Sequence, residues 1–225
     1  MKIGLLYAMP VEIRGLLKNA DAEPMEVISG VPFYQVSENI IAACGGVGKV
    51  NIAMAAELLC FHFKVDLVIN AGLAGGCADL PIGTLVLGSD CVQHDMDTSA
   101  IGDPVGLVSG INKIYFESDP RAREILLSAA ESLGLKACLG RIASGDKFIA
   151  SGEDKSRIIT DFAADACEME GCAIAQVAFV NGTPFAVVRA LSDSADGEAT
   201  MDYPTFLPIA ARNSTNMTLA LIREW

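Results

Sequence analysis

The stretch Asp66-Leu-Val-Ile-Asn-Ala71, followed at once by Gly72, is a short apolar run typical of a buried strand. The Ala- and Leu-rich residues 47–63 before it indicate a helix, and residues 84–92 after it indicate another buried strand. The same alternation extends toward both ends of the chain. It predicts further strands at 2–9, 32–37, 40–44, 138–143 and 184–190, and further helices at 11–20, 119–134, 168–181 and 203–223.

Strands that alternate with helices in this way predict an α/β fold. We expect a central mixed, largely parallel twisted sheet, partly closed toward a barrel and flanked by helices. The 225 residues, 52% of them apolar, can bury one full core, and no repeat, low-complexity tract or linker interrupts them. Residues 1–225 are therefore expected to form a single domain.

The charge of the chain limits its partners. Twenty-eight acids against sixteen bases give a net charge of -12, which repels nucleic-acid phosphates and anionic lipid, and no basic patch offsets it. No apolar run is long enough to span a membrane, and residues 3–9 lack the cleavage pattern of a signal peptide. We expect a cytoplasmic protein that binds neither nucleic acid nor membrane. The seven cysteines form no C-x-x-C pair and are interpreted as buried reduced thiols.

Charged and aromatic residues follow several of the predicted strands. They lie in Ser144-Gly-Asp-Lys-Phe-Ile149 and in Arg189-Ala-Leu-Ser-Asp193, while Glu168-Met-Glu170 stands at the predicted start of a helix. Because the carboxyl ends of parallel strands meet at one edge of a sheet, these residues should share a cleft with Glu12 and with the glycine-rich residues 72–76. Charges in such an apolar background are typical of a reactive site, so the chain is expected to be an enzyme.

Several other chemistries fit the sequence poorly. Gly45-Gly-Val-Gly-Lys49 is not a phosphate loop, because Ala43 and Val50 occupy the positions of its first glycine and its magnesium-binding hydroxyl. Residues 72–76 do not match a dinucleotide fingerprint, and no G-x-S-x-G nucleophile elbow is present. With two histidines in the chain, His94-Asp-Met-Asp97 is interpreted as a hydrogen-bonded loop. No metal and no cofactor are therefore expected.

The charged residues also have ordinary structural interpretations. Glu168 and Glu170 are expected at the start of a helix, about 200° apart, so that only one of them would face a ligand. Glutamates in a first helical turn also stabilise the helix dipole, Asp193 could cap a helix, and Arg189 could form a structural ion pair. The residues alone leave these alternatives open.

Taken together, the motifs resemble those of the bacterial 5'-methylthioadenosine/S-adenosylhomocysteine nucleosidases, in the superfamily of the purine nucleoside and uridine phosphorylases. The resemblance runs nearly from end to end. It implies the nucleoside phosphorylase-like fold and hydrolysis of the N-glycosidic bond, which releases adenine and a 5'-thio-substituted ribose. The matching segments are Met1–Gly4 with Ala8, Met9 and Glu12, 46–49, 72–76, His94–Asp95 with Asp97, 144–149, 168–170 and 189–193.

The resemblance also implies roles for individual residues. Glu12 would activate the attacking water, which Arg189 helps to position, and Glu170 would hold the ribose hydroxyls beside Met169. Asp193 would protonate adenine N7. The chemistry is sensible, because an oxocarbenium-like sugar needs one carboxylate for the water and another for the departing base. Further substrate contacts are expected from Met9, Leu73, Ile101, Phe148, Ile149, Glu168, Ser192 and Tyr203.

Some of these further contacts have a specific expected role. Phe148 would stack on the base while the backbone of Ile149 reads its edge. Ser192 would steady Asp193, and Tyr203 falls where the family carries an aromatic residue over the nucleoside.

The sequence departs from the family at two places. Leu73 stands where many relatives have serine, and residues 98–104 replace a stretch that usually contains an aromatic residue, with Ile101 where phenylalanine is common. The 5' substituent is therefore open, and a futalosine-like nucleoside is an alternative substrate. A phosphate-dependent phosphorylase and a non-catalytic nucleoside-binding module are further alternatives. Hydrolysis is favoured over phosphorolysis, because Ala8-Met-Pro-Val-Glu12 is not a phosphate-gripping loop.

The resemblance finally implies a homodimer whose interface borders the 5' end of the nucleoside. Residues 96–110 are apolar and punctuated by glycine, and left in water they would form an unusual patch. An isologous contact through Ile101 and its neighbours would bury this patch and close the pocket of the other subunit. An ordinary surface loop is the alternative interpretation.

Overall fold

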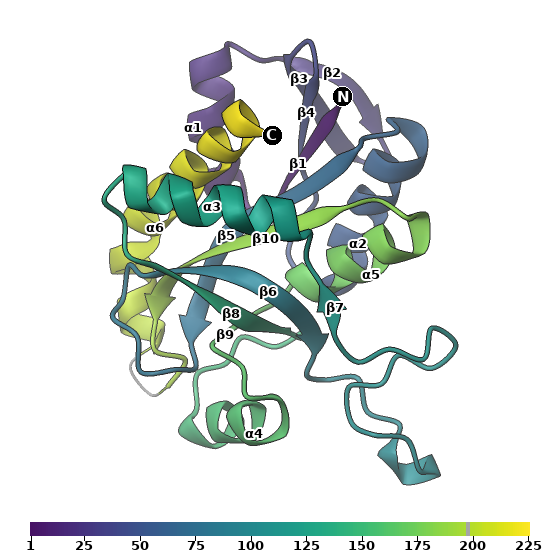
Figure 1. Ribbon diagram of the computed structural model, residues 1–225, viewed down its shortest axis with the longest axis vertical. Coiled ribbons are helices and arrows are strands. Elements are labelled where there is room, and N and C mark those ends of the chain that lie inside the picture. Colours follow the sequence, from purple (N-terminus) through teal and green to yellow (C-terminus); the bar gives the residue numbers. More distant parts are fainter. Residues whose placement is uncertain (197–198) are drawn as a thin grey trace.

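The computed structural model describes residues 1–196 and 199–225. Its strands form one sheet in the order β10-β6-β8-β9-β5-β1-β4-β3-β2, and β7 pairs with β6. Because β10 also pairs with β5, strands β5, β10, β6, β8 and β9 close into a ring, from which β1, β4, β3 and β2 extend (Figure 1). The strands are β1 (Ile3–Tyr7), β2 (Pro24–Ile28), β3 (Val31–Ser37), β4 (Ile40–Cys44), β5 (Leu67–Gly76), β6 (Leu85–Gln93), β7 (Phe116–Glu117), β8 (Ala137–Ser144), β9 (Ala166–Glu168) and β10 (Phe185–Asp193).

Parallel strands occupy the centre of the sheet. Strand β1 lies between β4 and β5 and is parallel to both, and β10 is parallel to β5. Every residue of β1 and β10 is buried. Strands that are covered on both faces read as continuous apolar runs, which explains why the sequence indicates them clearly. The prediction of an α/β fold with a mixed, partly barrel-like sheet is confirmed.

Helices cover the sheet in two groups. Helices α1, α3 and α6 contribute to one apolar cluster, and α2 and α5 pack against each other in a second cluster (Figure 1). The helices are α1 (Pro10–Ala20), α2 (Lys49–Glu57), α3 (Pro120–Ser132), α4 (Gly152–Phe162), α5 (Gly171–Asn181) and α6 (Ala199–Glu224). A π-helical turn, η1 (Leu58–His62), follows α2, and a 3₁₀ turn, η2 (Ser99–Ile101), lies in the long segment between β6 and β7.

Local signals start several of the helices. Pro10 occupies the first turn of α1, where a missing N–H costs nothing. The side chain of Asp119 accepts the N–H of Ala122 at 3.0 Å and caps α3, and Ser151 accepts the N–H of Asp154 at 3.2 Å and caps α4. Because α1 begins directly after β1, its first turn lies at the carboxyl end of a central parallel strand.

The structure corrects several predicted boundaries. Strand β5 does not end at Ala71 but runs to Gly76, because its glycine-rich half pairs with β10 and β9. The helix predicted at 168–181 begins at Gly171, since 166–168 pair with β8 as a strand. The helix predicted to reach Phe63 ends at Glu57 and continues as the π-helical turn. Strands β2, β7 and β9 and helix α4 were not predicted.

Within residues 1–196 and 199–225, no helix is both long enough and apolar enough to cross a bilayer.

Candidate active site

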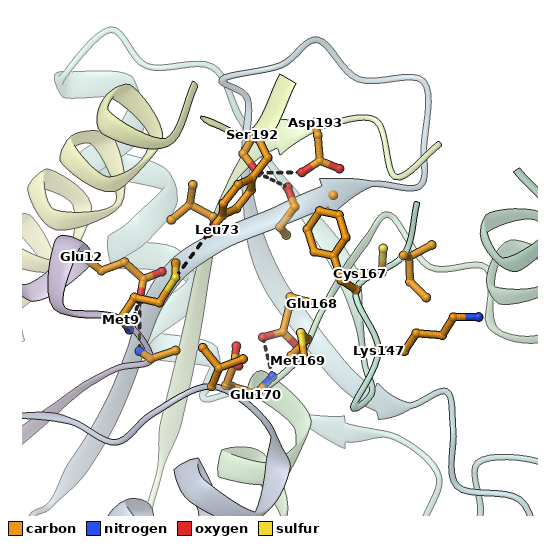
Figure 2. Close-up of a pocket in the computed structure, with 17 residues that line it drawn as sticks. Met9, Glu12, Leu73, Lys147, Cys167, Glu168, Met169, Glu170, Ser192 and Asp193 are labelled. Atoms are coloured by element: carbon orange, nitrogen blue, oxygen red, sulfur yellow. Dashed lines mark hydrogen bonds between the residues drawn. The ribbon is translucent and has the colours of Figure 1, made fainter. Parts of the chain in front are cut away.

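A cleft opens where β1, β5 and β10 end. Strand β9 and the segment after β8 complete its walls (Figure 2). Residues from distant parts of the sequence therefore meet in one place, as the strand-end argument predicts. The predicted site residues that line the cleft are Met9, Glu12, Leu73, Phe148, Ile149, Glu168, Met169, Glu170, Ser192, Asp193 and Tyr203.

Two predicted site residues do not line the cleft of this chain. Arg189 is buried behind the carboxylates, and Ile101 is 82% exposed on the segment between β6 and β7. Ala74, Gly75 and Lys147 also line the cleft, in segments expected there but without an individual role. Three further lining residues were given no place at the cleft, although each lies close in sequence to a predicted residue or segment. They are Ala8, Val47 and Cys167.

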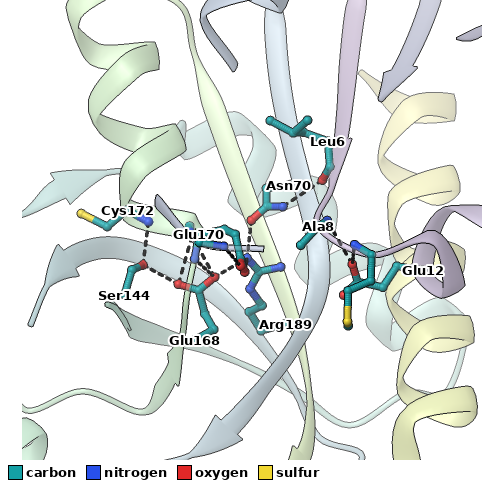
Figure 3. Close-up of polar contacts among 12 residues, drawn as sticks. Leu6, Ala8, Glu12, Asn70, Ser144, Glu168, Glu170, Cys172 and Arg189 are labelled. Carbon is teal, nitrogen blue, oxygen red and sulfur yellow. Dashed lines mark hydrogen bonds and ion pairs between the residues drawn. The ribbon is translucent and has the colours of Figure 1, made fainter. Parts of the chain in front are cut away.

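Glu12 is held at the start of α1 by the backbone. Its Oε2 accepts the N–H groups of Ala8 at 3.1 Å and Met9 at 2.8 Å (Figure 3). Burial raises the pKa of the Glu12 carboxyl, while the charge of Arg189 and the backbone N–H groups oppose that rise. Glu12 is thus a fixed carboxyl group facing the cleft, suited to accept a proton.

Gly72 separates Glu12 from Arg189. A Cβ atom at this position would lie 2.4 Å from Nη1 of Arg189 and 2.7 Å from Oε1 of Glu12, closer than real Cβ contacts allow. Glycine therefore lets the guanidinium from β10 and the carboxyl group from α1 approach the same point of β5. This close approach explains the chemical need for glycine in the middle of a buried strand.

Arg189 forms its close contacts with other residues. Its Nη2 donates to Glu168 and to Oδ1 of Asn70, and lies 3.9 Å from Oε2 of Glu170 (Figure 3). The Nδ2 of Asn70 in turn donates to the carbonyl oxygen of Leu6 at 2.8 Å. Arg189 is therefore in an ion pair, as one of the structural interpretations of the sequence predicted. Its charge acts on Glu12 through space and opposes the rise that burial causes in the pKa of that carboxyl group.

Glu168 connects β8, β9 and α5. It accepts a hydrogen bond from the hydroxyl of Ser144, and its Oε2 accepts the N–H groups of Glu170 at 3.0 Å and Gly171 at 2.8 Å. Ser144 also accepts the N–H of Cys172 at 2.7 Å. The expectation that Glu168 and Glu170 project from one helical turn is wrong. Glu168 ends β9, and its carboxylate satisfies the free N–H groups at the start of α5.

Glu170 precedes the first residue of α5 and faces the cleft. Its Oε1 accepts the N–H of Gly48 at 2.9 Å, so the loop before α2 fixes its position. Burial and the nearby charge of Glu168 raise the pKa of Glu170 to about 7, and the charge of Arg189 opposes this shift. Near neutral pH, Glu170 can therefore both hold a proton and accept a hydrogen bond.

Asp193 lies at the end of β10, on a different side of the cleft from Glu12 (Figure 2). Its Oδ2 accepts the hydroxyl of Ser192 at 2.8 Å, and its Oδ1 accepts the N–H of Ala195 at 2.9 Å. The contact with Ser192 is the one that the resemblance implies. These two donors fix the orientation of the carboxyl group relative to the cleft.

Two aromatic side chains border the cleft. The rings of Phe148 and Tyr203 meet edge to face, with centroids 5.7 Å apart and planes at 82°. The hydroxyl of Tyr203 lies 3.3 Å from the sulfur of Met9, and burial raises the pKa of Tyr203 to about 12. These residues form an apolar wall suited to the face of a flat ring.

The loop at His94 and Asp95 is hydrogen bonded, as predicted. The Nζ of Lys49 lies 2.6 Å from Oδ1 of Asp95, whose Oδ2 accepts the N–H of Asp146 at 2.9 Å. Asp146 also accepts the N–H of Lys49 at 2.7 Å. Within the described parts of the chain, no three His, Cys, Asp or Glu side chains are grouped so that they could hold a metal ion.

The cleft is suited to acid–base chemistry, because the carboxyl groups of Glu12, Glu170 and Asp193 lie in different polar environments. A buried guanidinium lies behind them, and an aromatic wall lies beside them. Fold and site together define an α/β enzyme that holds a small organic ligand at the carboxyl ends of its parallel strands.

Comparisons with known proteins identify the family. The sequence profile of the phosphorylase superfamily matches residues 2–223. A 5'-methylthioadenosine/S-adenosylhomocysteine nucleosidase of Actinobacillus succinogenes is 39% identical over 231 aligned residues, which cover 100% of this chain and 99% of the relative. The chain therefore belongs to the phosphorylase superfamily and, within it, to the 5'-methylthioadenosine/S-adenosylhomocysteine nucleosidases.

Solved structures of relatives have the same fold. A Helicobacter pylori nucleosidase variant with 5'-methylthioadenosine in its active site superposes with a TM-score of 0.95 at 33% identity, covering 100% of this chain and 99% of that one. A futalosine hydrolase of Helicobacter pylori also superposes with a TM-score of 0.95 at 33% identity, covering 100% of this chain and 98% of that one.

Proposed function

We propose that this chain hydrolyses the N-glycosidic bond of 5'-methylthioadenosine and S-adenosylhomocysteine. The observation that carries the proposal is the placement of Glu12, Glu170 and Asp193 around one cleft, on different sides of it (Figure 2). Cleavage of this bond develops positive charge on the sugar and negative charge on the base. Separate carboxyl groups can stabilise the sugar, protonate the base and accept the proton of a water molecule.

Each carboxyl group has surroundings that suit its proposed role. Glu12, fixed by two backbone N–H groups, accepts the proton of the attacking water. Glu170, held by the N–H of Gly48, binds the ribose hydroxyls. Asp193, oriented by Ser192, delivers a proton to adenine N7. Phe148 and Tyr203 offer apolar surface to the nucleoside. Arg189 acts behind these groups, by holding Glu168 and by favouring the ionised form of Glu12.

The charges at the cleft support hydrolysis over phosphorolysis. A phosphate co-substrate requires cationic or N–H donors directed at it. Lys147 is the one basic residue among the described residues that line the cleft, and its Nζ pairs with Asp154 at 2.7 Å. Four acidic residues line the same cleft. A dianionic phosphate would therefore be repelled, whereas water would not.

A futalosine-like nucleoside is the second candidate substrate. The structural likeness to the futalosine hydrolase of Helicobacter pylori is as close as that to the nucleosidase variant, with a TM-score of 0.95 for each. Both substrates would use the same carboxyl groups for cleavage and would differ at the 5' group. Relative kcat/KM values for the two nucleosides decide between them.

The test is release of free adenine from 5'-methylthioadenosine by the purified chain, without added phosphate or metal. We expect hydrolysis and a reducing sugar as the second product. Glu12→Gln is the matched variant, because its amide can still accept the N–H groups of Ala8 and Met9 but cannot accept a proton from water. We expect turnover to fall by at least about 10² in this variant. A strict requirement for phosphate, with ribose 1-phosphate as product, would instead identify a phosphorylase.

We also propose that the chain forms a homodimer, as the resemblance implies. Ile101 lies on a segment that projects away from the sheet (Figure 1) and cannot close the cleft of its own chain in this position. Val50, Met54 and Phe61, from α2 and η1, add exposed apolar surface. A two-fold contact that buries these side chains would bring the projecting segment to the cleft of the partner.

The remaining expectations concern the chain as a whole. One continuous sheet from β10 to β2 supports a single domain over residues 1–225. Seven free cysteines suit a reducing compartment and support a location in the cytoplasm.

A further inference from the structure

Two motifs of the sequence, residues 45–49 and 144–149, meet beside the cleft, and both contribute to its lining. The N–H of Lys49 donates to Oδ1 of Asp146 at 2.7 Å, although 97 residues separate the two in the sequence. The N–H of Asp146 donates to Oδ2 of Asp95 at 2.9 Å, and the Nζ of Lys49 lies 2.6 Å from Oδ1 of Asp95. Lys49, Asp95 and Asp146 thus form a closed set of three contacts, which we call the latch.

The latch completes the N-terminus of α2. Gly48, the residue before this helix, has a φ of 94° and no side chain with which to cap it. Asp146 takes that place, because its carboxylate accepts the N–H of Lys49, the first residue of α2. A Cβ atom at Gly48 would lie 3.0 Å from Oδ1 of Asp146, so glycine also leaves room for this carboxylate. The start of α2 therefore depends on a residue from the segment after β8.

The N–H group next to the one that Asp146 accepts holds Glu170. Gly48 donates its N–H to Oε1 of Glu170 at 2.9 Å. Gly48 and Lys49 are adjacent, so Asp146 and Glu170 bind two consecutive N–H groups of one stretch of backbone. A change in the position of Lys49 would carry Gly48 with it. Asp146 can therefore act on Glu170 through this backbone, without touching the cleft ligand.

Further hydrogen bonds anchor the latch to β6 and α5. The side chains of Lys49 and Asp95 are 19% and 30% exposed. The Nζ of Lys49 also donates to Oε1 of Gln93 at 3.0 Å, and the Nε2 of Gln93 donates to Oε1 of Gln176 at 2.5 Å. Ion pairs near the surface contribute little to stability on average, whereas a network with fixed geometry can hold a loop in one position. We therefore expect the latch to matter more for position than for stability.

We propose that Asp146 is a positioning residue for Glu170. Together with Lys49 and Asp95 it fixes the start of α2, so that the N–H of Gly48 points at the carboxyl group of Glu170. The binding of ribose hydroxyls by Glu170 rests on the proposed function, whereas its placement by Gly48 does not. Two measurements are therefore needed, of which one requires no catalysis.

The first measurement is the titration of Glu170 by carboxyl ¹³C NMR of glutamate-labelled protein, with Glu170→Gln to assign the signal. The N–H of Gly48 favours the ionised form of Glu170, so its loss in Asp146→Ala should raise the titration midpoint above the wild-type pKa of about 7. Removing the negative charge of Asp146 acts in the opposite direction, so a rise reports the lost N–H. The other charged groups that act on Glu170 are unchanged in this variant; they are Glu168, Arg189 and Glu12.

Two amide variants separate position from charge. Asp146→Asn removes the charge but keeps an oxygen that accepts the N–H of Lys49, so it should recover most of what Asp146→Ala loses. Asp95→Asn should weaken the latch, because both oxygens of Asp95 accept a hydrogen bond and an amide has only one oxygen. Asp161→Ala, at an exposed position on α4, is the control and should titrate as the wild type does.

The second measurement is kcat/KM for adenine release from 5'-methylthioadenosine. We expect a fall of about tenfold in Asp146→Ala, comparable to the loss of one hydrogen bond to a charged group. The same substitution should have little further effect in Glu170→Gln, because an effect that acts through Glu170 is then already lost. Failure of the wild type to release adenine would refute the proposed function, and the NMR titration would still decide the role of Asp146.

Three results would overturn the positioning role. The first is a wild-type titration midpoint of Glu170 in both Asp146→Ala and Asp95→Asn. The second is an Asp146→Asn variant that is as impaired as Asp146→Ala. The third is an equal fall of kcat/KM in the presence and absence of the Glu170 carboxyl group. A cooperative urea transition shows that each variant is folded, and Asp95→Asn carries the test if Asp146→Ala does not fold.

Discussion

Glu168 is the ion-pair partner of Arg189, and both side chains are at most 3% exposed. The guanidinium also lies 3.9 Å from Glu170 and acts on Glu12 through space, so one cation serves three carboxyl groups. A single positive charge cannot favour the ionised form of all three equally. Glu168 makes the direct contact with Arg189, and burial together with the charge of Glu168 raises the pKa of Glu170.

Replacing Glu168 by glutamine should therefore change the titration of Glu170. Removal of the negative charge of Glu168 lowers the pKa of Glu170, so the acid limb of kcat/KM should move from near pH 7 to lower pH. The measurement is the pH profile of adenine release. Glu117→Gln, at an exposed position on β7, is the control and should leave the profile unchanged. An unmoved acid limb in Glu168→Gln would contradict the shared-cation argument.

Glu170 should also make the stability of the fold depend on pH. Its pKa rises from 4.5 in the unfolded chain to about 7 in the folded protein, so the folded state binds the proton more tightly. Its contribution to stability is complete below pH 4.5 and is lost as the pH rises toward 7 and above. The Glu170→Gln variant has no ionisable group at this position, so its stability does not fall in this way as the pH rises. Relative to wild type, its free energy of unfolding should increase by on the order of 2–3 kcal/mol between pH 5 and pH 8.

Urea unfolding at the two pH values measures this difference. Glu131→Gln, at an exposed position on α3, provides the reference for removing a glutamate charge. A constant difference between Glu170→Gln and wild type across the pH range would mean that Glu170 is ionised throughout.

The central fold was predictable because its strands are buried on both faces. β1 is a continuous apolar run and β10 begins with one, Phe185-Ala-Val-Val188, and this local pattern is sufficient to indicate both strands. β9 has only three residues, and its pairing with β8 and β5 depends on contacts distant in sequence. α4 was missed although Ser151 and Asp154 form a recognisable N-terminal cap, so a local signal was available.

The site was predictable to a similar degree. Because the carboxyl ends of parallel strands meet at one edge, Glu12, Phe148 and Asp193 could be placed at one cleft, whereas the place of Glu170 was implied by the resemblance alone. The partner of Arg189 was not predictable, since it is set by how β5, β9 and β10 stack side by side and by the contact with Asn70. The pairing of buried charges depends on how neighbouring strands pack against each other. The residue pattern within a single strand therefore cannot predict it.

Asp193→Asn tests the proposed acid. Asparagine can still accept the N–H of Ala195 and can donate its own amide N–H to the hydroxyl oxygen of Ser192, but it cannot deliver a proton to the base. We expect turnover to fall by at least about 10², while the fold and much of the affinity for adenine are kept. Asp161→Asn, at an exposed position on α4, is the control. Turnover close to wild type in Asp193→Asn would require another proton donor.

Gly72→Ala tests the approach of Glu12 and Arg189. The added methyl group would lie 2.4 Å from Nη1 of Arg189 and 2.7 Å from Oε1 of Glu12, so at least one of these buried groups must move. We expect the free energy of unfolding to fall by about 1–3 kcal/mol, together with a large loss of kcat. Gly15→Ala is the matched control, because its Cβ would meet nothing within 4 Å on α1. Full activity in Gly72→Ala would show that this approach is not needed.

Ile101→Asp tests the proposed dimer and its link to the 5' group. Ile101 is 82% exposed and does not line the cleft of its own chain, so we expect it to affect the substrate through a partner. A charge there would have to be buried in the interface, which weakens association. We expect a smaller sedimenting mass and a lower kcat/KM for 5'-methylthioadenosine, with a smaller effect on adenosine, because each buried CH₂ contributes about 0.8 kcal/mol. Val27→Asp, on β2 and 63% exposed, is the control. A fully active wild-type monomer, or an unchanged preference between the two nucleosides in Ile101→Asp, would contradict an interface that closes the cleft.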